Sequence, residues 1–227
     1  MGTAVSCRSS ARALALCAVF VAWIVAAPVL AADEAPADAP APGTDTPWYK
    51  DWRKSEEPLW AITGFFGEGM DGVFSESLLN AFEVSSNSER VVGITLRRRI
   101  GGFTRHITFE AEGMYALHYG TQRYQEFGIA AYARWGTFPW NEYVITSVAF
   151  GVGPSYTDTT PELEKREHGK NDVRTLNQFN FELTGALPKY PNVQALARLQ
   201  HRSGIGGLIN GVEDASNFWT FGLIYRF

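Results

Sequence analysis

Alternation of apolar and polar side chains constrains the fold of this chain more than any other feature. The clearest case is the segment 104–119, where one set of alternate residues is apolar or aromatic: Ile107, Phe109, Ala111, Tyr115, Leu117 and Tyr119. The other set is mostly polar: His106, Thr108, Glu110, Glu112, Met114 and His118. Successive side chains of a β-strand point to opposite faces, so this period of two predicts a strand between an apolar and a polar environment.

Eight segments have this character, and we predict strands at 59–67, 90–100, 104–119, 123–136, 143–156, 177–187, 192–203 and 217–227. Several exceed ten residues, which is long enough to cross a bilayer at a tilt. Short connectors (101–103, 137–142, 188–191) alternate with long ones (68–89, 157–176, 204–216), and only 120–122 breaks the rule. The pattern predicts an all-β fold, an eight-stranded antiparallel transmembrane β-barrel, with a soluble β-sandwich or lipocalin-like barrel as the alternatives.

Eight strands enclose an interior that side chains fill, not a pore. Charged residues of the polar faces should therefore meet in the lumen: Arg97, Arg99, His106, Glu110, Glu112, His118 and Arg198. We interpret them as a salt-bridge network and not as a metal site, because no compact set of ligands stands out. The chain also ends on Phe227 with Tyr225 two residues earlier, which resembles the assembly signal of bacterial outer-membrane proteins.

The first residues are typical of a secretory signal. Arg8 and Arg12 precede an apolar run over 13–29, and small residues follow for cleavage after Ala31 or Ala32. We predict a signal peptide at 1–31, a disordered Pro/Ala/acidic periplasmic lead-in at 32–57 and the barrel at 58–227. Both cysteines, Cys7 and Cys17, lie in the first segment, so disulfides and thiolate chemistry are not expected in the mature chain.

Charge and motifs exclude several classes of function. Removal of residues 1–31 changes the formal charge from −4 to −6, because it removes two arginines and no acid. An acidic chain without a basic tract argues against nucleic acid as a partner. Neither a phosphate-binding loop nor a dinucleotide or zinc motif is present in the sequence, so we expect no cofactor and no metal.

A candidate active site lies at the end of the segment 192–203. His201 and Ser203 share the parity of its apolar residues, and Asn217 shares the parity of Trp219 and Phe221. If the first predicted strand runs from the periplasm to the outside, the seventh (192–203) runs in the same direction and ends near the outer leaflet. The eighth strand, its hairpin neighbour, begins there, which brings Asn217 beside His201. Serine needs an adjacent base, and the base needs an orienting acceptor. The plainer interpretation is an interfacial histidine and serine that cap a strand.

The loop that follows is rich in glycine. Backbone N–H groups at Gly204 and Gly206 could point at a developing oxyanion, and Asn210 could add a side-chain donor. The plainer interpretation is an ordinary flexible hairpin loop.

The C-terminal stretch resembles the lipid A 3-O-deacylase (PagL) family, acyloxyacyl hydrolase-like outer-membrane barrels that remove an acyl chain from lipopolysaccharide. The resemblance implies His201 as base, Ser203 as nucleophile and Asn210, followed by Gly211, as an oxyanion residue. Gly204 stands where the best understood members carry an asparagine. The orienting acid corresponds to Glu213 by the local Asn-Gly string and to Asn217 by the register of the last strand, and the sequence leaves both open.

The first hypothesis is thus an outer-membrane serine esterase that hydrolyses an acyl ester of lipid A without a cofactor. Its partners would be lipopolysaccharide and the outer membrane, with a homodimer as one option for the oligomeric state. The second is a non-catalytic structural or adhesive outer-membrane barrel, whose long loops would carry binding. A third is a soluble periplasmic lipid carrier.

Overall fold

The computed structural model describes residues 58–71, 86–103, 106–162, 164–165, 173–206, 208–210, 212 and 215–227. The chain divides into two units, 1–46 and 47–227, and all described residues belong to the second. The predicted signal peptide and lead-in therefore lie outside the described residues. Within the described part, no helix has the length and apolar character needed to cross a membrane.

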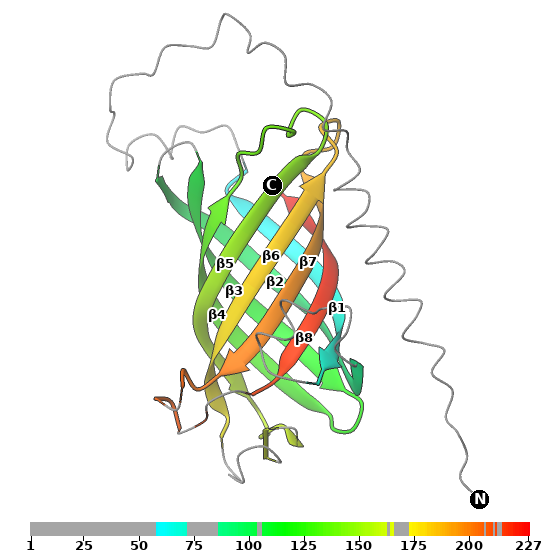
Figure 1. Ribbon diagram of the computed structural model, residues 1–227, viewed down its shortest axis with the longest axis vertical. Coiled ribbons are helices and arrows are strands. Elements are labelled where there is room, and N and C mark those ends of the chain that lie inside the picture. Colours follow the sequence, from blue (N-terminus) through cyan, green and yellow to red (C-terminus); the bar gives the residue numbers. More distant parts are fainter. Residues whose placement is uncertain are drawn as a thin grey trace, which may run out of the picture. The chain divides into compact units, whose positions relative to one another are not determined.

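Eight antiparallel strands form a closed barrel (Figure 1). They are β1 (Trp60–Met70), β2 (Ser86–Phe103), β3 (Ile107–Tyr119), β4 (Tyr124–Trp135), β5 (Ile145–Thr157), β6 (Thr175–Ala186), β7 (Val193–Ser203) and β8 (Asn217–Arg226). Each strand pairs with the next, and β8 closes the barrel on β1. The predicted eight-stranded antiparallel barrel is confirmed.

The largest departure from the predicted strands is at both ends of β2. The strand begins at Ser86, four residues before the predicted start, and continues through the predicted turn at 101–103 to Phe103. A register irregularity between Arg99 and Gly101 lets Gly101 pair with Phe109 on β3. The backbone ladder continues where the side chains no longer alternate, because main-chain hydrogen bonds do not require apolar neighbours.

The outward face of the barrel is apolar. Large apolar side chains that point away from the lumen stay exposed on several strands: Ile62, Phe66, Ile94, Ile129, Leu223 and Tyr225. Such a continuous apolar belt around a closed barrel suits hydrocarbon, and barrels of this kind reside in bacterial outer membranes. We therefore place this chain in the bacterial outer membrane. The longest intervals between strands follow β1, β5 and β7, and because outer-membrane barrels carry their long connectors on the outer side, we assign the ends of these three strands to that side.

Ionised side chains fill the middle of the lumen. The Glu182 carboxylate accepts hydrogen bonds from Arg97, Arg134 and Arg198 at 2.7–2.9 Å. Glu110 and Glu112 complete the network through contacts with the same arginines. The predicted salt-bridge network is thus present for Arg97, Glu110, Glu112 and Arg198, whereas the His106 ring, also predicted to be part of it, stacks on the Trp135 ring at a centroid distance of 5.1 Å. No cluster of metal-ligand type occurs among the described residues.

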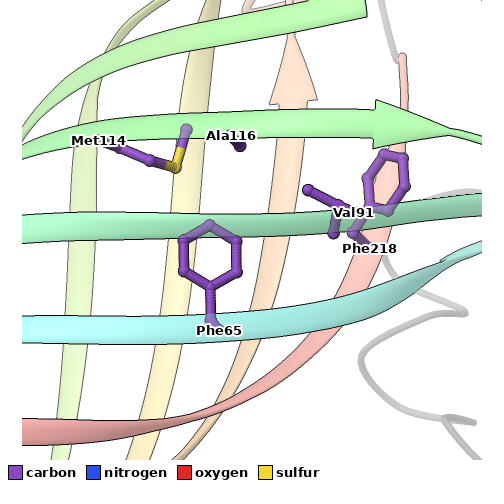
Figure 2. Close-up of a cluster of buried hydrophobic side chains, with 5 residues drawn as sticks. All are labelled: Phe65, Val91, Met114, Ala116 and Phe218. Carbon is purple, nitrogen blue, oxygen red and sulfur yellow. The ribbon is translucent and has the colours of Figure 1, made fainter. Parts of the chain in front are cut away.

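The remaining lumen holds both polar and apolar side chains. His118, predicted in the network, instead contacts Glu126 at 2.7 Å and stacks on the Tyr124 ring. Figure 2 shows an apolar cluster in which side chains from β1, β2, β3 and β8 converge: Phe65, Val91, Met114, Ala116 and Phe218. These buried groups fill the interior, as expected for eight strands.

Candidate active site

His201 on β7 and Asn217 at the start of β8 are register partners. Both side chains lie on the outward face, because the lumen-facing positions of β7 are the alternate residues that include Arg198 and Arg202. His201 Nδ1 and Asn217 Oδ1 are 2.8 Å apart, and the two residues are only 6% and 0% exposed. The pairing that parity and hairpin topology predicted is therefore present.

This contact fixes the tautomer of His201. The amide oxygen of Asn217 can only accept a hydrogen bond, so Nδ1 of His201 carries the proton and donates it. In the neutral form of the ring, the lone pair is then on Nε2, and this is the form in which histidine serves as a general base.

Apolar side chains surround the pair on the outward face. The Phe179 ring of β6 stacks on the His201 ring at a centroid distance of 5.9 Å. Leu199, two residues before His201 on the same face, is fully buried. Water is thereby kept from the histidine, and electrostatic interactions are stronger in such surroundings than in solvent.

Ser203 is the last residue of β7 and lies two positions after His201, on the same face. Its side chain is 5% exposed, and its hydroxyl oxygen accepts a hydrogen bond from the Ile205 N–H at 3.1 Å. Alternate residues of a strand are about 7 Å apart at Cα, so the two side chains project from one patch of surface. At least one backbone N–H therefore points toward the serine hydroxyl.

The connector after Ser203 turns back tightly at Gly204. A Cβ atom at Gly204 would lie 2.1 Å from the Val212 carbonyl oxygen and 2.5 Å from that of Ile209. The Ile209 N–H also donates to the Gly204 carbonyl at 2.8 Å. Only glycine permits this close approach, so Gly204 shapes the turn beside the serine.

The other predicted loop residues take different places. Asn210 has a positive φ of 54° and donates from Nδ2 to the Thr175 carbonyl at 2.8 Å, which ties the connector to the start of β6. Gly206 also has a positive φ, of 60°. Glu213, the alternative acid, lies outside the described residues.

One residue of the site was missed by sequence reasoning. Asn177 on β6 is the register partner of Ser203 and is 8% exposed. Its Nδ2 donates to the Gln178 carbonyl at 3.2 Å. Asn177 has the outward parity of Phe179 and begins the predicted strand 177–187, so an outward polar residue at the outer end of a strand was the available signal.

Comparisons with known proteins leave the family open. No family model and no curated protein matches the chain. Solved structures that resemble it include the outer membrane enzyme PagL (10% identity, 74% of this chain and 99% of that one, TM-score 0.46). Neisserial surface protein A resembles it equally (13% identity, 74% and 97% covered, TM-score 0.46).

A third similar structure is LpxR from Salmonella typhimurium (11% identity, 64% of this chain and 54% of that one, TM-score 0.31). Likenesses this distant do not transfer an activity. The described residues also give no support to a homodimer, and none is proposed.

Proposed function

We propose that this chain is an outer-membrane serine esterase, similar to the lipid A 3-O-deacylase (PagL) family, that hydrolyses an acyl ester of lipid A. One observation carries the proposal. The His201–Asn217 hydrogen bond leaves Nε2 as a proton acceptor on the apolar outward face, two residues from the Ser203 hydroxyl.

The chemistry follows from these roles. Ser203 Oγ attacks the ester carbonyl while His201 Nε2 takes the hydroxyl proton, and the same nitrogen then protonates the departing sugar or hydroxyacyl oxygen. A water molecule, deprotonated by His201, then attacks the acyl-serine carbonyl. The bond to Ser203 Oγ breaks, His201 returns the proton to Oγ, and the fatty acid is released. Asn217 holds the imidazole in the required tautomer, as asparagine does in Cys-His-Asn enzymes.

The backbone turn after Ser203 can supply N–H groups that stabilise the oxyanion of the tetrahedral intermediate. We assign this role to the backbone N–H groups of Gly204 and Gly206, because the Ile205 N–H already donates to Ser203 Oγ. Asn210 has the task of holding that turn through the Thr175 carbonyl. We favour Asn217 over Glu213 as the orienting group, because Asn217 contacts the His201 imidazole.

The position of the site favours a lipid substrate. His201 and Ser203 face outward at the outer end of β7, next to apolar and aromatic side chains. A molecule anchored in the outer leaflet by acyl chains reaches this face without entering the lumen. Lipid A, the acylated anchor of lipopolysaccharide, is such a molecule.

Mass spectrometry of lipid A tests the proposal. Cells that express the wild-type chain should lose one acyl mass from lipid A, and cells that express Ser203→Ala should not. Ser88→Ala, which changes an exposed serine of β2, is the matched control and should behave as wild type. Unchanged deacylation by a Ser203→Ala protein that still migrates as a heat-modifiable barrel would refute the assignment.

A second candidate is a non-catalytic barrel. The observation that favours it is the Ser203 hydroxyl itself, which accepts the Ile205 N–H and is largely buried, as a strand-capping serine would be. A fluorophosphonate ester probe separates the candidates, because it labels an activated serine. Labelling of wild type but not of Ser203→Ala supports the esterase, and equal absence of labelling supports the non-catalytic barrel.

A further inference from the structure

Behind His201, on the lumen side of β7, lies a buried ionic contact that the proposed chemistry does not use. Arg202 stands between His201 and Ser203 and faces inward. Its Nη1 lies 2.5 Å from Glu164 Oε1, and its Nη2 donates to the Arg174 carbonyl at 3.2 Å. Glu126 on β4 lies 3.6 Å from Arg202 Nε. The Arg202 and Glu164 side chains are each 1% exposed.

The same carboxylate oxygen also contacts β8. Ser216, the residue before Asn217, donates from its hydroxyl to Glu164 Oε1 at 3.3 Å. The Arg202 N–H donates in turn to the Ser216 carbonyl at 2.9 Å. Glu164, from the connector between β5 and β6, therefore joins the neighbour of His201 on β7 to the neighbour of Asn217 on β8.

The contact lies where the strand pairing ends. His201–Asn217 is the last register pair of β7 and β8, and beyond it one backbone hydrogen bond continues the ladder. Strand ends separate readily unless further contacts hold them. A buried charge-assisted contact at this point restricts the separation of the two strands, and with it the distance from His201 Nδ1 to Asn217 Oδ1.

We propose that Glu164 is a positioning residue for the esterase site, acting from inside the barrel through Arg202 and Ser216. The proposal rests on the proposed function for its kinetic consequence. Active sites tolerate displacements of only about 0.5 Å. Loss of the Glu164 contact therefore slows the chemical step and leaves the binding of lipid, on the outward face, unchanged.

Kinetics on the purified full-length barrel in detergent form the first test. Glu164→Ala should lower kcat about tenfold with little change in KM, because misplaced catalytic groups reduce the rate and not the affinity. Glu164→Gln keeps an oxygen that accepts from Arg202 and Ser216, and should restore most of the activity. Glu162→Gln, which alters the contact with Lys165 on the same connector, should have wild-type kinetics.

Nuclear magnetic resonance separates failure of the inference from failure of the proposed function. With ¹⁵N-labelled histidine, and His201→Gln for assignment, the His201 Nδ1 proton should be protected from exchange in wild type and Glu164→Gln. In Glu164→Ala it should exchange rapidly. An unchanged proton signal in Glu164→Ala overturns the positioning role whether or not the barrel hydrolyses any ester.

A variant that removes fewer contacts serves as the test if Glu164→Ala does not fold. Ser216→Ala removes only the Glu164 contact with β8 and should reduce kcat by a few-fold, with faster exchange of the same proton. Wild-type kcat and wild-type protection in Ser216→Ala would overturn the inference.

Discussion

His201 and Arg202 are adjacent in the chain, yet their side chains lie on opposite sides of the barrel wall. The imidazole meets Asn217 on the outward face, and the guanidinium meets Glu164 in the lumen. One strand end thus carries a candidate catalytic base on one side and a buried ionic contact on the other. Substitutions on the two sides should therefore have different consequences.

Substitutions of Asn217 should raise or lower kcat, depending on the side chain that replaces it. Asn217→Asp places a carboxylate against His201 Nδ1, which stabilises the imidazolium better than an amide and should raise kcat by roughly tenfold. Asn217→Leu removes the acceptor and should lower kcat by about a hundredfold, since the base loses its orientation. Ester hydrolysis by purified variants measures both, and equal rates in Asp, Asn and Leu proteins would exclude an orienting role.

Gly204→Ala should disturb the turn beside Ser203. The added Cβ would lie 2.1 Å from the Val212 carbonyl oxygen, so the connector has to move. We expect a loss of about a hundredfold in kcat, because small displacements of groups near the nucleophile are costly, with a barrel that remains heat-modifiable. Gly64→Ala on β1, where a Cβ meets nothing within 4 Å, is the control and should keep wild-type activity.

Glu182 should matter for stability. Its carboxylate faces three buried arginines, so Glu182→Gln leaves Arg97, Arg134 and Arg198 short of countercharge. Breaking such buried pairs costs about 3–5 kcal/mol, which denaturant unfolding in detergent can measure. Glu68→Gln removes a partly exposed contact with Arg90 at 3.9 Å and should cost less than about 1 kcal/mol. Similar costs for the two variants would contradict a stabilising network.

Glu164 should make stability depend on pH. Burial raises the pKa of its carboxyl above the ordinary value, an effect that Glu126 reinforces and that the Arg202 guanidinium opposes only in part. The folded state then binds the proton more tightly than the unfolded state. Its contribution to stability is fully present below the unfolded pKa and is lost as the pH rises through the folded pKa.

The measurement compares unfolding midpoints of wild type and Glu164→Gln between about pH 4 and pH 7, a range that starts near the ordinary carboxyl pKa. The wild-type midpoint should fall relative to that of the variant as the pH rises. A difference that stays constant would show that the Arg202 contact balances burial, and a difference that grows in favour of wild type would show that the contact outweighs burial.

The strands were largely predictable because polar side chains that face the lumen alternate with apolar side chains that face outward. In β3 the buried Glu110 and Glu112 alternate with outward Phe109 and Ala111, as expected from the sequence. The start of β2 was not predictable in this way, because residues 86–89 carry no apolar alternation and join the sheet through the backbone.

The candidate site was predictable only for residues whose positions follow from strand parity and from the hairpin connection of neighbouring strands. His201, Ser203 and Asn217 lie on one hairpin, so their placement follows from strand parity and topology. Asn177 required the exact register between β6 and β7, which no local pattern supplies. Glu164 lies in a connector 38 residues before Arg202, where no periodicity indicates that it contacts β7.

The filled lumen has a consequence for how any reaction at His201 should be measured. Because ionised and apolar side chains occupy the interior, the outward site meets molecules that are already dissolved in the membrane. The relevant concentration is then the mole fraction of the reacting lipid in the leaflet or micelle, and not its molarity in the sample. Dilution of the substrate with inert detergent at constant total amount should therefore slow the reaction, as expected for catalysis in two dimensions.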